Sequence, residues 1–186
     1  MRRLIVTENS SLDGIIAPMD GWFDPAAADA DVTAANQEHR DAADGLLLGR
    51  QTYQDLYGFW PHQHNDRTGI SDYLNRVPKY VVSRTLQTAD WENTTILRGD
   101  LAEEVAALKA QSGNDIVVTG SVSVVHALAP TGLVDLYRLW IYPAVQGYGR
   151  RLFTEGVQTG LKLTDSRTFG SGVVLLEYQP TGGGNA

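Results

Sequence analysis

Short apolar runs alternate with amphipathic stretches along most of the chain. Five runs bounded by Gly, Pro, Asp or Asn are typical of strands buried on both faces of a parallel sheet: Leu4–Thr7, Leu46–Leu48, Tyr80–Ser83, Thr94–Leu97 and Ile116–Thr119. A longer, aromatic-rich run follows at Leu136–Tyr142. The last two runs, Leu161–Thr164 and Val173–Gln179, flank a glycine-rich turn at 169–172 and predict an antiparallel hairpin.

Helices are predicted between these runs, at Asp31–Ala43, Thr52–Tyr57, Ser71–Val77, Leu101–Gln111 and Val122–Leu128. The fourth is the clearest, because Asp100 is a good N-cap and Leu101, Val105 and Leu108 recur at helical spacing. Strands that alternate with helices predict an α/β fold. We therefore expect a mostly parallel eight-stranded sheet flanked by helices, with an antiparallel C-terminal hairpin.

The 186 residues contain no internal repeat and no linker-like segment. This predicts one domain over residues 1–180, because a chain of this length can bury one continuous core. The last six residues, Thr-Gly-Gly-Gly-Asn-Ala at 181–186, predict a flexible tail.

Composition narrows the function. A net charge of -7 argues against a nucleic-acid partner, and the lack of cysteine excludes disulfides and thiolate chemistry. The chain carries no signal-like N-terminus and no apolar run of the roughly 20 residues that a membrane helix needs, so we expect a cytoplasmic protein without a membrane partner. His62, His64 and Asp66 are too few firm ligands for a metal site, and a surface loop is expected there.

Three predicted strands end in residues suited to an anion, and ligands of open α/β sheets bind beyond such ends. The segments are Gly49-Arg50-Gln51-Thr52, Ser83-Arg84-Thr85 and Thr119-Gly120-Ser121-Val122-Ser123. Each alone also fits an ordinary helix cap or turn. Together, in an acidic protein, small residues, hydroxyls and arginines at three strand ends favour a dinucleotide with a 2′-phosphate.

These segments, with Ser11-Leu12-Asp13-Gly14-Ile15-Ile16-Ala17 before them, resemble the dihydrofolate-reductase superfamily. The resemblance is strongest to the branch that contains the reductase domain of bacterial riboflavin biosynthesis and its stand-alone relatives. It extends in order from Leu4 to about Tyr178, and it implies an eight-stranded sheet and bound NADPH.

The resemblance also implies which residues bind the cofactor. Gly49, Arg50, Thr52, Ser83 and Arg84 would bind the 2′-phosphate and adenosine side. The turn of Thr119, Gly120, Ser121, Val122 and Ser123 would bind the pyrophosphate through backbone amides. The nicotinamide would lie beside Asn9, Ile16 and Ala17. Dihydrofolate reductases carry a Gly-Gly pair where this chain has Gly120-Ser121.

Bound NADPH predicts hydride transfer, for which the protein orients the substrate and assists with a proton. Asp13 is the preferred acidic residue, although Asp-Gly is also a common turn pair. The carboxylate position of dihydrofolate reductases falls on or beside Thr33, with Asp31 about half a helical turn away, which makes dihydrofolate a doubtful substrate. Trp22 and Tyr53 are candidate substrate contacts, and both side chains would also suit the core.

The leading hypothesis is a reductase of a small pyrimidine- or pteridine-like heterocycle, similar to 5-amino-6-(5-phosphoribosylamino)uracil reductase. Two alternatives stay open: a protein that senses NADPH without turnover, and one that binds an antifolate-like ligand. A homodimer is also expected, because Leu136–Tyr142 and the final hairpin would form a sheet edge that needs cover.

Overall fold

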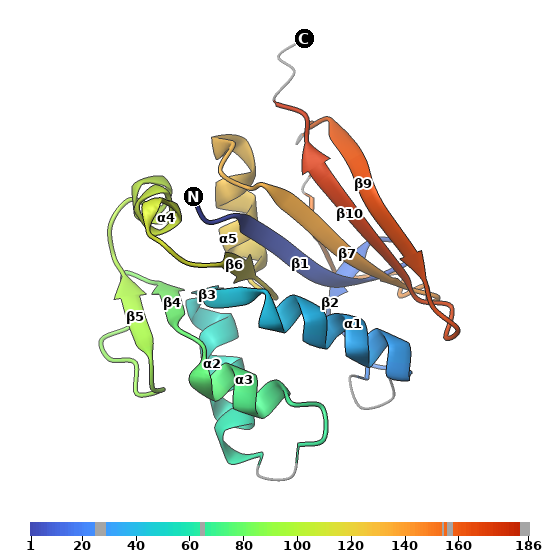
Figure 1. The fold of residues 1–186 in the computed structure, drawn as a ribbon, viewed down its shortest axis with the longest axis horizontal. Coiled ribbons are helices and arrows are strands. Elements are labelled where there is room, and N and C mark those ends of the chain that lie inside the picture. Colours follow the sequence, from blue (N-terminus) through green and yellow to red (C-terminus); the bar gives the residue numbers. More distant parts are fainter. Residues whose placement is uncertain (25–28, 64–65, 154, 156–157, 183–186) are drawn as a thin grey trace.

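The computed structural model describes residues 1–24, 29–63, 66–153, 155 and 158–182. Its main sheet contains β1 (Leu4–Ser11), β3 (Ala43–Gly49), β4 (Lys79–Val82), β5 (Thr94–Leu97), β6 (Asp115–Val118), β7 (Leu136–Tyr142), β9 (Leu161–Thr168) and β10 (Val174–Pro180). These eight strands lie in the order β5-β4-β3-β6-β1-β7-β10-β9 (Figure 1). Neighbours from β5 to β7 are parallel, whereas β10 is antiparallel to β7 and to β9. The predicted sheet and C-terminal hairpin are confirmed.

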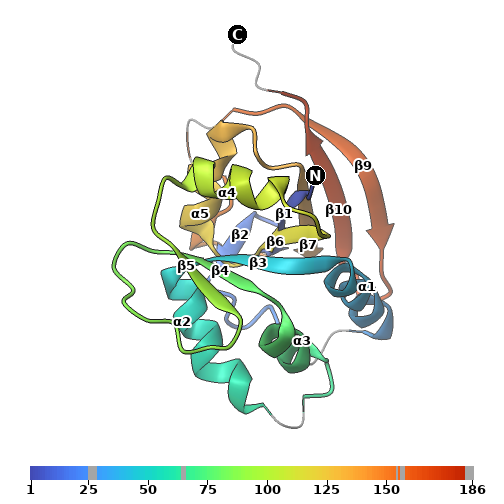
Figure 2. The same ribbon diagram turned by 60° about the vertical axis from the view of Figure 1, so that its left-hand side comes forward.

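Within the described residues, five α-helices pack on the sheet: α1 (Ala30–Asp41), α2 (Arg50–Phe59), α3 (Ile70–Arg76), α4 (Leu101–Ala110) and α5 (Val122–Leu128). Two 3-10 segments, Trp60–His62 and Ala129–Thr131, extend α2 and α5. Helices α4 and α5 cover one face, and α1, α2 and α3 cover the other (Figures 1 and 2). This gives three layers and separate apolar clusters on the two faces of the sheet.

Local signals placed the helices well. The Asp100 side chain accepts hydrogen bonds from the amides of Ala102 and Glu103, as expected of an N-cap. Helix α1 begins at Ala30, one residue earlier than predicted, because Asp29 caps it by accepting from the amide of Val32. Helix α2 begins directly at Arg50, with Gly49 as its N-cap.

Two short strands escaped prediction. Strands β2 (Ile15–Ala17) and β8 (Arg150–Arg151) pair antiparallel in a small second sheet. Segments of two and three residues carry no periodicity, so only the tertiary contact between distant loops makes them strands. Of the predicted tail, Thr181 donates its amide to the carbonyl of Gly160, and 183–186 lie outside the described residues.

The aromatic strand β7 is an interior strand, bonded to β1 and β10, and β9 forms the sheet edge on that side, with β5 at the other edge. Strand β9 is exposed along nearly its whole length. The homodimer therefore stays a prediction, with β9 rather than β7 as the edge concerned. Within the described ranges, none of the helices is long and apolar enough to cross a membrane.

Candidate functional site

The carboxyl ends of four parallel strands, β1, β3, β4 and β6, lie next to one another along one end of the sheet. Gly49 of β3 pairs with Val82 of β4, and Val118 of β6 pairs with both Leu47 of β3 and Val6 of β1. The three predicted anion-binding segments follow β3, β4 and β6, so the register brings them to the same edge.

Two of these segments are joined by hydrogen bonds. The backbone amide of Gly49 donates to Oγ of Ser121 at 2.9 Å, and Oγ1 of Thr52 donates to the carbonyl of Gly120 at 3.0 Å. Gly120 has φ of +63°, and a Cβ there would lie 3.2 Å from Cγ2 of Thr52. The turn between β6 and α5 is therefore held against the start of α2, and its geometry favours glycine.

The third segment supplies a turn and an exposed cation. Oγ of Ser83 accepts from the amides of Thr85 and Leu86 at 3.2 and 2.9 Å, so this buried hydroxyl shapes the turn after β4. Arg84 is exposed, as is Arg50 at the end of neighbouring β3. The two guanidinium groups thus come from adjacent strand ends and lie open to solvent.

The residues expected beside a nicotinamide lie on β1 and β2. Asn9 of β1 is half-buried and pairs with Trp140 of β7. Ile16 of β2 is buried with the cluster under α4 and α5, and Ala17 is half-buried next to it. These placements bring β2 over the end of β1, beside the segments described above.

Glu8 is a site residue that the sequence analysis missed. It lies on central strand β1, is 5% exposed, and accepts a hydrogen bond from the amide of Gly120. Its Oε1 has no hydrogen-bond partner among the described residues. Burial raises the pKa of this carboxyl to about 8, and the Gly120 amide opposes that shift.

The Glu8 contact bears on one expectation. The Gly120 amide that was predicted to bind pyrophosphate also acts on the Glu8 carboxyl, and its role in cofactor binding stays a prediction. The amides of Ser121, Val122 and Ser123 at the start of α5 have no intrahelical acceptor by geometry and keep that potential. The signal that could have identified Glu8 was an acidic residue in a strand that begins with the apolar run Leu-Ile-Val.

Asp13 proves to be a brace between two loops. Its carboxylate accepts from Oγ of Ser11 at 2.6 Å and from the amides of Gln146 and Gly147 at 3.0 and 2.8 Å. These hydrogen bonds, that of Ser11 first, lower the pKa of Asp13 to about 2. The expectation that Asp13 donates a proton is wrong for this arrangement, because the group is ionised at neutral pH.

Trp22 lines a cavity of about 600 Å³ on the α1 side of the sheet. The lining residues come from four segments: Gly21, Trp22, Phe23, Asp24, Val32, Tyr142, Pro143, Ala144, Ser171 and Val173. The rings of Trp22 and Phe23 contact Tyr142 edge-on, at centroid distances of 5.6 and 5.4 Å. The size and lining suit a small flat ligand.

Tyr53 lies elsewhere. It is 3% exposed, stacks on Tyr57 and accepts a hydrogen bond from the amide of Trp91 in the core under α2 and α3. The predicted substrate contact is therefore wrong for Tyr53, since a periodic aromatic on a helix usually faces the core and here it does.

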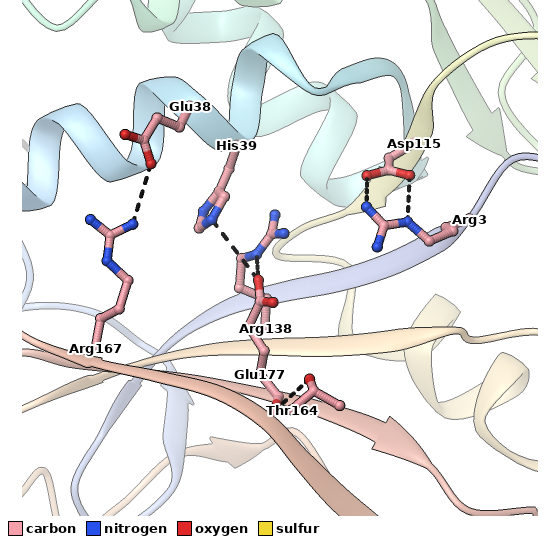
Figure 3. Close-up of polar contacts among 8 residues, drawn as sticks. All are labelled: Arg3, Glu38, His39, Asp115, Arg138, Thr164, Arg167 and Glu177. Carbon is pink, nitrogen blue, oxygen red and sulfur yellow. Dashed lines mark hydrogen bonds and ion pairs between the residues drawn. The ribbon is translucent and has the colours of Figure 1, made fainter.

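A second polar cluster lies under α1, away from these strand ends (Figure 3). Nε of Arg138 bonds Oε1 of Glu177 at 2.6 Å, with Nε2 of His39 at 3.9 Å from the same oxygen. Burial, and then the charge of Arg138, lower the pKa of His39 to about 4. His39 is thus neutral at physiological pH, and the cluster joins α1 to β7 and β10.

No group of three metal-ligating side chains occurs in the part of the chain that the structure describes. His62 ends the 3-10 segment after α2. His64, which the sequence analysis considered with it as a metal ligand, lies outside the described residues.

Comparison with known proteins identifies the family. Residues 2–175 match the model of the RibD C-terminal domain. The chain is 34% identical over 185 residues to YyaP of Bacillus subtilis (strain 168), named as an uncharacterized protein, and the match covers 97% of this chain and 96% of YyaP.

Two solved structures share the fold. A diaminohydroxyphosphoribosylaminopyrimidine deaminase/5-amino-6-(5-phosphoribosylamino)uracil reductase of Thermotoga maritima superposes with a TM-score of 0.66 at 16% identity, over 96% of this chain and 56% of that one. Dihydrofolate reductase of Enterococcus faecalis, complexed with NADP(H), superposes with a TM-score of 0.60 at 15% identity, over 96% of each chain. The fold is thus dihydrofolate-reductase-like, and the chain belongs to the RibD C-terminal domain family.

Proposed function

We propose that this protein is an NADPH-dependent reductase that acts on a small pyrimidine- or pteridine-like heterocycle. The observation that carries the proposal is the direct hydrogen bonding between two of the segments predicted to bind an anion, Gly49 to Ser121 and Thr52 to Gly120. Both lie at strand ends of a chain that belongs to the RibD C-terminal domain family. The two solved structures with this fold are both named as reductases, which supports an oxidoreductase as the general class.

The residues present fit the cofactor. Gly120 is exposed and keeps the turn free of a side chain, and a buried carboxyl fixes that turn from below. In this proposal Arg50, Thr52, Ser83 and Arg84 bind the adenosine end and its 2′-phosphate. The amides of Ser121, Val122 and Ser123 bind the pyrophosphate, and Asn9, Ile16 and Ala17 adjoin the nicotinamide. When bound, NADPH supplies a hydride.

The chain's own side chains then bind and orient the substrate. Trp22 and Tyr142 offer apolar surface in the cavity and exclude water from it. Asp13 holds the loop that follows the lining residues Pro143 and Ala144, through the amides of Gln146 and Gly147. Glu8 shares the α4–α5 face of β1 with Leu4 and Val6, so we assign it to the turn rather than to the substrate.

A fluorescence titration with NADPH and NADH at low salt tests the cofactor. We expect micromolar binding of NADPH and much weaker binding of NADH, because only NADPH carries the 2′-phosphate. Arg50→Ala and Arg84→Ala should remove most of the difference, whereas Lys162→Ala, an exposed cation on β9, should preserve it. If neither nucleotide binds, the proposal fails.

One observation favours the alternative of binding without turnover. The resemblance to dihydrofolate reductases places their helix carboxylate on or beside Thr33, whose hydroxyl donates to the carbonyl of Asp29 at 3.0 Å. Oxidation of NADPH with any member of a heterocycle panel would exclude this alternative. Tight NADPH binding without oxidation across the panel would favour it.

A further inference from the structure

The cavity beside Trp22 lies between the loop after β2, the end of β7, the β9–β10 turn and the start of α1. Its volume of about 600 Å³ falls within the usual range for small-molecule sites. Trp22, Phe23 and Tyr142 give it three aromatic walls, on which a flat ring packs favourably.

The charged side chain among the described lining residues of this cavity is acidic. Asp24 lines the cavity directly. Neither lysine, arginine nor histidine is among the described lining residues, and all fifteen lysines and arginines belong to the described part of the chain.

The start of α1 is also closed to an anion. The carboxylate of Asp29 accepts from the amide of Val32 through Oδ1 and from the amide of Ser171 through Oδ2, at 2.7 and 3.0 Å. Val32 and Ser171 both line the cavity. The helix end that could attract a phosphate is thus already paired with an internal carboxylate.

The field of Asp29 reaches the aromatic wall. The pKa of the Tyr142 hydroxyl is raised to about 12, first by burial and second by the negative charge of Asp29. A phosphate or carboxylate bound in the cavity would meet the same repulsion, whereas an uncharged or protonated ring would not.

Resting on the proposed reductase function, we propose that this cavity selects a flat heterocycle that carries no phosphate or carboxylate, and that Asp24 and Asp29 provide the selection. The substrate class would be an uncharged or cationic pyrimidine or pterin. This differs from the Thermotoga maritima reductase, whose name specifies a phosphoribosylated pyrimidine.

Two matched probe pairs test the selection: 6-hydroxymethylpterin against pterin-6-carboxylate, and uracil against orotate. Binding is measured by equilibrium dialysis, without NADPH and again with NADPH. We expect the uncharged member of each pair to bind about tenfold more tightly. A factor of this size is what repulsion between two like charges produces in a partly solvated site. Trp22→Ala should weaken both members, which locates the probes in this cavity.

The double variant Asp24→Asn/Asp29→Asn should bring the two affinities to within about twofold, and asparagine keeps a good N-cap on α1. Asp31→Asn is the matched control, because Asp31 lies exposed on the first turn of α1 and does not line the cavity.

Three outcomes would overturn the proposal: equal or tighter binding of the anions, a preference unchanged in the double variant, or no binding of any probe. Failure of the cofactor function looks different, because the probes would then show the expected preference while the protein bound no NADPH.

Discussion

Two carboxyl groups five residues apart take opposite charge states. Asp13 lies in the loop after β1, where a hydroxyl and two amides lower its pKa to about 2. Glu8 lies within β1, where burial raises its pKa to about 8 against a single amide. The residue types differ little, so surroundings decide which carboxyl keeps a proton at pH 7.

The two carboxyl groups, one within β1 and one in the loop after it, have different structural roles. The ionised Asp13 binds the amides of a distant loop, which follows the cavity-lining residues Pro143 and Ala144. The protonated Glu8 supports the Gly120 turn without placing a negative charge beneath it. A carboxylate in a loop loses little free energy on ionisation when all its hydrogen bonds are made. In a core, ionising a carboxyl that has one oxygen without a hydrogen-bond partner carries a large desolvation penalty.

The largest expected effect comes from Glu8→Gln, measured by urea unfolding between pH 4 and 9. The folded protein holds the Glu8 proton up to about pH 8, while the unfolded chain releases it near 4.5. The contribution of Glu8 to the stability of the folded protein is therefore fully present below pH 4.5. Wild type should lose this stability as the pH rises to 8. Relative to the variant, the loss should reach about 5 kcal/mol. If the unfolding free energies of wild type and Glu8→Gln changed in parallel with pH, Glu8 would not be protonated in the folded protein at pH 7.

Asp13→Asn is the opposite case in the same experiment. The pKa of Asp13 is lowered from 3.8, so its stabilisation is present above pH 3.8 and disappears as pH falls towards 2. Wild type should exceed this variant at neutral pH and converge with it in acid, while Glu8→Gln converges with wild type near pH 4 and diverges above. If both variants differed from wild type over the same pH range, the two carboxyl groups would not have opposite pKa shifts.

Gly120→Ala should break the support on which Glu8 acts. With φ of +63° and Thr52 at 3.2 Å from the new Cβ, we expect a loss of about 2 kcal/mol in unfolding free energy. Gly132→Ala is the control, because Gly132 has φ of +70° but nothing within 4 Å of an added Cβ. Equal losses at both positions would mean that the contact with Thr52 contributes nothing.

The charge state of Glu8 should also affect cofactor binding. Ionised Glu8 beneath the turn would repel a pyrophosphate, so NADPH affinity of wild type should fall by up to about fivefold from pH 8 to 9 as Glu8 with its pKa of about 8 ionises. Glu8→Gln should bind NADPH equally across that range. Isothermal titration calorimetry at matched ionic strength measures both profiles, and an identical decline in the variant would exclude Glu8 as the cause.

The smallest effect is expected at Ser11, which serves the Asp13 side alone. Its Oγ donates to Asp13 and accepts from the amide of Ile15 at 3.0 Å. Ser11→Ala should cost about 1 kcal/mol and raise the pKa of Asp13 towards its ordinary value. A carboxyl NMR titration measures that pKa. An unchanged value would show that the amides of Gln146 and Gly147 suffice.

Much of the fold was predictable because its signals are local. Apolar runs marked all eight strands of the main sheet, and Asp100 marked the start of α4, since each element needs its own periodicity and cap. Strands β2 and β8 were not predictable, because their pairing joins residues more than 130 positions apart.

The candidate site divides in the same way. The sequence by itself determined the strand-end segments Gly49–Thr52, Ser83–Arg84 and Thr119–Ser123, because parallel strands deliver their following loops to one edge. Only the tertiary structure decided that Asp13 is a brace, that Tyr53 belongs to the core, and that Glu8 keeps its proton. Burial and hydrogen-bond partners come from residues far away in sequence, and these set a pKa and an accessible surface, whereas residue type alone does not.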